Sequence, residues 1–151
     1  MDFILSLISS KALMVPLGAW FLAQVLKITI ASIQAKQMKL AYFFTMGGMP
    51  SSHSTLVSAV ATTVAVVEGV GSPLFAVAAI FAVIIIHDAA GVRQTVSKQS
   101  VMLNRILDEL LKGKPAFEQR LRELIGHSTL QVAAGTILGI AFSLLVLLVL
   151  Q

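Results

Sequence analysis

The sequence predicts an all-α integral membrane protein: one domain, residues 1–151, folded as a helical bundle of about four transmembrane helices with a cytoplasmic amphipathic helical insert. Of the 151 residues, 57% are hydrophobic and only 12% are charged, whereas soluble domains average about 45–50% and about 25%. Four segments approach the roughly 20 apolar residues that a spanning helix needs. The chain has no cysteine, which excludes disulfides, a cysteine metal site and a thiol nucleophile.

Each of the four predicted spans has its own pattern of polar interruptions. The first contains Gln24 and Lys27, the second is rich in serine and threonine, and the third ends close to His87 and Asp88. The fourth carries no charged residue. The predicted spans are residues 12–33, 50–67, 73–90 and 130–150.

The insert, residues 92–126, holds most of the charge of the chain. Apolar residues recur there with the period of an amphipathic helix, which Gly113 and Pro115 are expected to end. A second short helix is expected over residues 116–125. We interpret the insert as an interfacial cytoplasmic hairpin. The apolar stripe of its first helix consists of Leu103, Ile106, Leu107, Leu110 and Leu111.

The basic residues predict the orientation of the chain. If all four segments span, nine lysines and arginines of the 34–49 and 92–126 connections share one side, and the other side has only Lys11. The positive-inside rule makes the nine-residue side cytoplasmic, with both termini outside. The formal net charge of +4 then favours anionic membrane lipids as partners over nucleic acid. We expect an integral protein of the cell (plasma) membrane.

The most informative motif is residues 47–55, Gly-Gly-Met-Pro-Ser-Ser-His-Ser-Thr. Two glycines permit a turn, and proline favours the first position of a helix. Pro50, Ser51, Ser52 and Ser54 would then lie at a helix N-terminus, where backbone N–H groups and the helix dipole attract phosphate. His53 adds a side chain that exchanges a proton near neutral pH. The alternative is an ordinary helix start with a structural histidine.

A second motif, Gly126-His127, opens the fourth span on the same predicted face of the membrane. Gln131 lies one helical turn after His127 and could orient its imidazole. At the end of the third span, Asp88 could pair with Lys27 or with Arg93, as a structural ion pair or as part of a site. We expect these groups to converge with residues 50–53 on the cytoplasmic face as one phosphate site.

The fourth span also contains a GxxxG spacing, formed by Gly135 and Gly139. Such a spacing permits close helix–helix contact and is compatible with a homodimer.

Together these motifs resemble the divergent type 2 phosphatidic acid phosphatase-like family, also described as acid phosphatase/vanadium-dependent haloperoxidase-related. The matching residues run from Gln24 and Lys27 through Gly-Gly-Met-Pro-Ser-Ser-His-Ser, Asp-Ala-Ala-Gly-Val-Arg at 88–93 and Gly126-His127. The resemblance implies a membrane phosphatase that acts on a lipid or isoprenoid phosphate without a metal or other cofactor.

By the same resemblance, His127 is the nucleophile that forms a phosphohistidine and His53 is the general acid. Pro50, Ser51 and Ser52 resemble the phosphate-binding turn of that family. From their charge, hydroxyl groups and spacing, we expect Lys27, Ser54 and Arg93 to add to the phosphate site, and Asp88 and Gln131 to orient neighbouring groups. The chain departs from the wider superfamily at Gln131, where an aspartate is expected, and it lacks an Arg-Pro after its lysines. An amide orients an imidazole but does not offset its positive charge. The alternative is a non-catalytic membrane protein that binds or moves a lipid with a phosphate headgroup.

Overall fold

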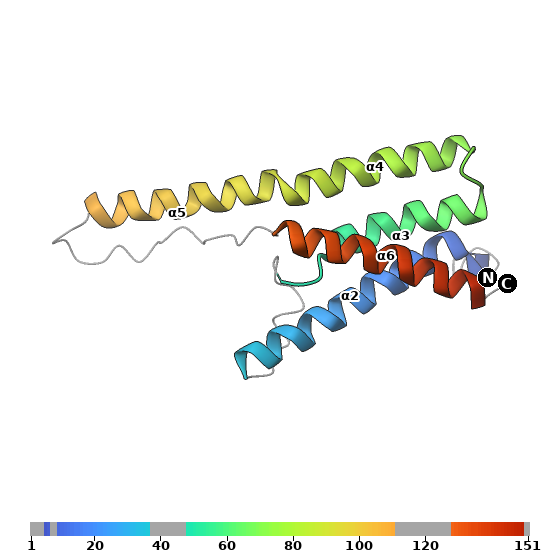
Figure 1. Cartoon of the computed structure of the whole chain (residues 1–151), viewed down its shortest axis with the longest axis horizontal. Coiled ribbons are helices and arrows are strands. Elements are labelled where there is room, and N and C mark those ends of the chain that lie inside the picture. The colour runs from blue at the N-terminus through green and yellow to red at the C-terminus, as the bar shows by residue number, and fades with distance from the viewer. Residues whose placement is uncertain (1–4, 7–8, 37–47, 111–127, 150–151) are drawn as a thin grey trace.

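The computed structural model describes residues 5–6, 9–36, 48–110 and 128–149, and every regular element in this part is a helix. Four helices form a bundle, and one extends beyond it (Figure 1). The predicted all-α membrane bundle is confirmed. The helices are α2 (Lys11–Ala35), α3 (Ser52–Val67), α4 (Pro73–Ala90), α5 (Val92–Leu110) and α6 (Thr129–Val149).

The helices α2, α3, α4 and α6 begin and end within two residues of the predicted spans. Local capping explains the sharpest of these boundaries: the Ser72 hydroxyl accepts a hydrogen bond from the Phe75 N–H at 3.1 Å, and Pro73 opens α4. The helices α2, α4 and α6 are long and apolar enough to cross a membrane, and α3 is a shorter apolar helix of 16 residues. At 1.5 Å per residue α3 is about 24 Å long, less than the roughly 30 Å of a bilayer core.

The helix α3 is the centre of the bundle. It packs against α2, α4 and α6, whereas α2 and α4 do not contact each other in the part of the chain that the structure describes. Small residues fill the interfaces: Ala19, Ala23, Ala59, Ala78 and Ala82 are buried. Large side chains such as Phe21, Ile80 and Leu145 are more than half exposed. Small residues inside and large apolar residues outside are typical of helices packed in a lipid environment.

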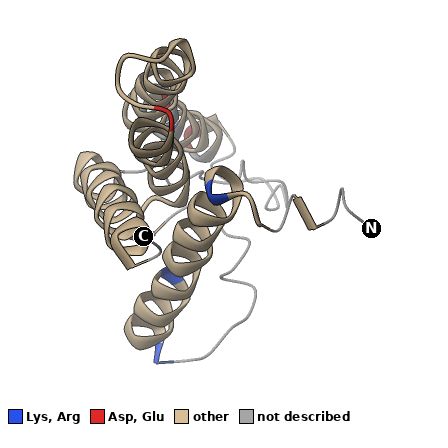
Figure 2. Cartoon of the chain, turned by 90° about the vertical axis from the view of Figure 1, so that its right-hand side faces the viewer, with Lys and Arg blue, Asp and Glu red and all other residues tan. Residues whose placement is uncertain are grey.

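The start of α2 and the end of α6 lie at the same end of the bundle (Figure 1). The end of α2 and the starts of α3 and α6 lie toward the opposite end. This arrangement agrees with the predicted topology, in which the termini share one side. Charged residues are sparse over the bundle helices α2, α3, α4 and α6 (Figure 2). The assignment of one side to the cytoplasm still rests on the basic residues alone.

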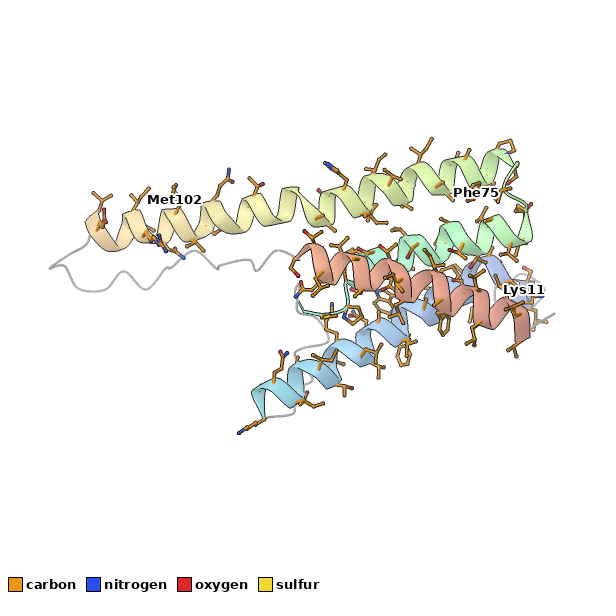
Figure 3. The ribbon with its side chains drawn as sticks, viewed as in Figure 1. Lys11, Phe75 and Met102 are labelled. Atoms are coloured by element: carbon orange, nitrogen blue, oxygen red, sulfur yellow. The ribbon has the colours of Figure 1, made fainter. Side chains whose placement is uncertain are left out.

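The insert differs in form from its prediction, because α5 begins at Val92, directly after Gly91, and continues the line of α4 (Figure 1). The sequence explains the earlier start, since Val96, Leu103 and Leu110 repeat every seven residues along one face. Leu103 and Leu110 are 49% and 71% exposed. Figure 3 shows Met102 on the part of α5 that has no other described helix beside it. The expected contact of this stripe with lipid stays a prediction, and the expected helix over 116–125 lies outside the described residues.

Candidate functional site

The N-terminus of α3 contains four buried residues, Pro50, Ser51, Ser52 and Ser54. Ser51 is the N-cap, and its hydroxyl accepts hydrogen bonds from the Ser54 N–H at 3.4 Å and from the Ser54 hydroxyl at 3.0 Å. An N-cap oxygen satisfies one of the N–H groups that the first turn of a helix leaves without an acceptor. The Ser51 and Ser54 hydroxyls are thus engaged with each other and with the helix start.

The helices α3 and α6 meet where α6 has no side chains. A Cβ atom at Gly135 would overlap the Ser51 carbonyl oxygen, and one at Gly139 would overlap the Ser58 hydroxyl and the Thr55 carbonyl oxygen. The GxxxG spacing therefore serves a contact within the chain. This face of α6 is covered by α3 and not open to a second copy, so the spacing no longer favours a homodimer.

Hydrogen bonds between α3 and α6 fix their register. The Ser51 N–H donates to the Gln131 carbonyl oxygen at 3.0 Å, and further along the Ser58 hydroxyl donates to the Thr136 carbonyl oxygen at 3.2 Å. The N-termini of the two helices are thereby held side by side, as Figure 1 shows. The Ser51 N–H, which the sequence analysis expected to face an anion, is instead used to bind α6.

Lys27 is the charged residue in the interior of α2, and only 3% of its surface is exposed. Its ammonium donates to the Ser52 hydroxyl at 3.2 Å, which links α2 to the first turn of α3. Gly48, with φ of 100°, lies over the aliphatic part of this side chain, so that a Cβ there would be 3.3 Å from Lys27 Cγ. The structure thus brings together Lys27, Ser52 and the glycine turn, three elements of the predicted site.

The start of α6 is capped by Ser128 and Gln131. The Gln131 N–H donates to the Ser128 hydroxyl at 3.3 Å, and the Ser128 N–H donates to Gln131 Oε1 at 3.0 Å. This reciprocal pair is a capping box. The sequence analysis assigned the Gln131 side chain to His127, but its acceptor oxygen is engaged in capping α6.

The remaining predicted site residues are His53, Asp88, Arg93 and His127. His53 is exposed in the first turn of α3, and Asp88 is half-buried in the last turn of α4. Arg93 lies at the start of α5, but its side chain is outside the described part of the structure, as is the whole of His127. No three His, Asp or Glu side chains among the described residues come together as a metal site requires.

A comparison of the whole chain with known families gives a match by family model. The model of the Divergent PAP2 family matches residues 8–142. The chain belongs to this family. The uncharacterized membrane protein YuiD of Bacillus subtilis (strain 168) is 34% identical over 151 residues, covering 93% of this chain and 96% of that protein. No solved structure matches the chain.

This divergent PAP2 protein also uses residues that the sequence analysis passed over. The Thr55 hydroxyl donates to the Ser51 carbonyl oxygen at 2.9 Å, and the Ser58 hydroxyl donates to the Ser54 carbonyl oxygen at 2.6 Å. Bonds from a hydroxyl to the carbonyl four residues earlier let polar side chains lie buried in an apolar helix. The signal was the serine and threonine spacing of residues 51–58, which places small polar groups toward α6.

Proposed function

We propose that this divergent PAP2 protein binds the phosphate group of a membrane lipid or isoprenoid phosphate beside Lys27 and the N-terminus of α3, and hydrolyses the phosphate ester. One observation carries the proposal: the Lys27 ammonium is buried and donates to a neutral hydroxyl. A group that serves packing alone would be apolar at this position of α2.

The energetics favour an anion next to this lysine. Burying an ammonium costs several kcal/mol even after the protein relaxes. A unit negative charge about 4 Å away contributes roughly 4 kcal/mol at an effective dielectric constant near 20, which is comparable to that cost. The adjoining N-termini of α3 and α6 add the positive ends of two helix dipoles. A phosphate group supplies the required charge and several acceptor oxygens.

The family supplies the chemical step. A nitrogen of the His127 imidazole attacks phosphorus, the bond from phosphorus to the ester oxygen breaks, and His53 gives its proton to the departing oxygen. Water then attacks the phosphohistidine and gives a proton back to His53, which releases inorganic phosphate and restores both histidines. In support, His127 directly precedes Ser128 in the chain, and Gln131 in the same helix turn is bonded to Ser51.

A second function, binding without hydrolysis, is favoured by one observation. Gln131 stands where the superfamily has an aspartate. Its side-chain oxygen accepts a hydrogen bond from the Ser128 N–H, which caps α6. An imidazole nucleophile without a carboxylate partner lacks the group that stabilises its positive charge; in the analogous serine triad, replacing that aspartate with an amide lowers kcat about 10⁴-fold. The same phosphate site would then recognise or move a lipid.

For location and partners, we propose the plasma membrane with the site on its cytoplasmic face, which follows from the nine basic residues of the two long connections. Membrane lipids are the expected surroundings, and a lipid or isoprenoid phosphate is the expected ligand.

Phosphate release by the purified protein in nanodiscs tests the proposal, with phosphatidic acid, an isoprenoid phosphate and glycerol phosphate as substrates. We expect release from a lipid phosphate, its loss in His127→Ala, and a decrease of about 10²–10⁴-fold in His53→Ala. Equilibrium binding of the same lipids is measured in parallel. Binding without release would select the second function, and a protein that neither binds nor releases would refute both.

A further inference from the structure

One face of α3 is not closed by its neighbours. The helix is joined to α2 through Ser52 and to α6 through Ser51 and Ser58. Because α2 and α4 do not contact each other in the described part of the chain, the sector of α3 between them has no helix packed across it.

Helix geometry identifies the residues of this sector. At 100° per residue, the side chains of His53, Leu56, Val60 and Val67 fall within about 60° of one another. They lie next to Ser52 and on the side of α3 that faces away from α6. The valines just beyond them, Val57 and Val64, are buried at 7% and 6% exposure. In contrast, His53 and Val67 are exposed, and Leu56 and Val60 are half-buried. We call this set the open face of α3: His53, Leu56, Val60 and Val67.

The open face is polar at one end and apolar along its length. It begins at His53, next to the Ser52 hydroxyl that holds Lys27, and continues through Leu56, Val60 and Val67. Its apolar part, from Leu56 to Val67, covers 11 residue steps or about 17 Å, close to the roughly 15 Å of one leaflet of a bilayer core. A cation at one end and an apolar strip of leaflet length have the layout of a lipid with an anionic headgroup.

We infer that the open face binds the hydrocarbon chain of the lipid whose phosphate lies at Lys27, so that the ligand enters from the bilayer between α2 and α4. The inference rests on the proposed function, because the phosphate anchors the chain. It makes the preferred ligand a long-chain lipid phosphate, since a water-soluble phosphate makes no contact with Leu56 and Val60. Because an acyl chain in the bilayer is already out of water, the face contributes through packing against the chain and not through transfer of methylenes from water.

The test compares two variants that introduce the same side chain, tryptophan, in different places. Val60→Trp fills the middle of the open face. Ile80→Trp, the matched control, lies on α4 opposite the buried Ala78 and Ala82 and is already 63% exposed. Binding of phosphatidic acid and of inorganic phosphate is measured for each protein in phosphatidylcholine nanodiscs. We expect Val60→Trp to weaken phosphatidic acid binding at least tenfold with inorganic phosphate binding unchanged, and Ile80→Trp to alter neither.

A second measurement needs no substitution. Phosphatidic acid with a diazirine in the middle of its acyl chain is photolysed with the unmodified protein, and we expect labelled peptides from residues 53–67. Unchanged phosphatidic acid binding by folded Val60→Trp, or no label in residues 53–67, would overturn the inference. So would efficient disulfide formation between two copies of Val60→Cys, which would assign the face to a dimer. If the unmodified protein binds no phosphate at all, it is the proposed function that fails.

Discussion

The substitution Gly135→Ala tests whether the close contact of α3 and α6 creates the candidate site. A Cβ at this position would overlap the Ser51 carbonyl oxygen and would lie 3.2 Å from both the Ser51 carbonyl carbon and its nitrogen. These are backbone atoms at a capped helix start, so no side chain rotation relieves the overlap. We expect α6 to move away from α3 and to lose the hydrogen bond from the Ser51 N–H to the Gln131 carbonyl.

The size of the effect follows from three contributions. Overpacking of an interior costs about 1–3 kcal/mol, and the lost hydrogen bond costs about 0.5–1.5 kcal/mol. Alanine in place of glycine within a helix returns about 1 kcal/mol. We therefore expect the free energy of unfolding to fall by about 0.5–3.5 kcal/mol, and binding of phosphatidic acid to weaken because the two N-termini separate.

Unfolding in mixed micelles, followed by circular dichroism, measures the first quantity, and equilibrium binding measures the second. Gly71→Ala is the control, because a Cβ there meets nothing within 4 Å, and we expect a change below about 0.5 kcal/mol. If Gly135→Ala were as stable as the parent and bound phosphatidic acid equally well, the helix contact would not be what forms the site.

Three further predictions concern the lysine, the cap and the topology. Lys27→Gln should weaken phosphatidic acid binding at least tenfold in an equilibrium assay. The free energy of unfolding should stay the same or rise, since a buried charge is removed. Binding equal to that of the parent would place the site elsewhere. Gln131→Ala should lower the free energy of unfolding by about 0.5–2 kcal/mol, the range for a lost helix cap, whereas Gln131→Glu should preserve it because glutamate also completes a capping box; equal stability of all three proteins would contradict the capping role. Single cysteines at positions 37 and 114 should resist an impermeant thiol reagent in intact cells, and labelling of either from outside would reverse the orientation.

The fold was largely predictable because a bilayer restricts the choice of structure. Apolar runs of about 20 residues become helices in lipid, where every backbone polar group needs an internal partner, and the Ser72-Pro73 start of α4 carries its cap in the sequence. The same rule did not indicate where α5 begins. Its first half is polar, and the repeat of Val96, Leu103 and Leu110 is recognisable only over the two heptad steps from Val96 to Leu110.

The site was less predictable because spacing along one helix does not identify a partner. Gln131 is four residues from His127 and three from Ser128, and both spacings bring side chains together. Only the structure shows that the amide oxygen bonds to the Ser128 N–H. Gly135 posed the same difficulty, since a GxxxG spacing suits a contact with a second copy as well as with another helix of the same chain.

Most polar groups at the start of α3 have an explanation in folding alone, and this sharpens the case for Lys27. Ser51 and Ser54 cap the helix, the Ser51 N–H holds α6, and the Thr55 and Ser58 hydroxyls bond to carbonyl oxygens of their own helix. Each of these contacts satisfies a polar group in an apolar setting and needs no ligand. The Lys27 ammonium is different, because within the described residues it bonds to the neutral Ser52 hydroxyl, which does not balance its charge. A neutral residue of similar length would pack as well at lower cost, so the charge at this position is best explained by an anion that it binds.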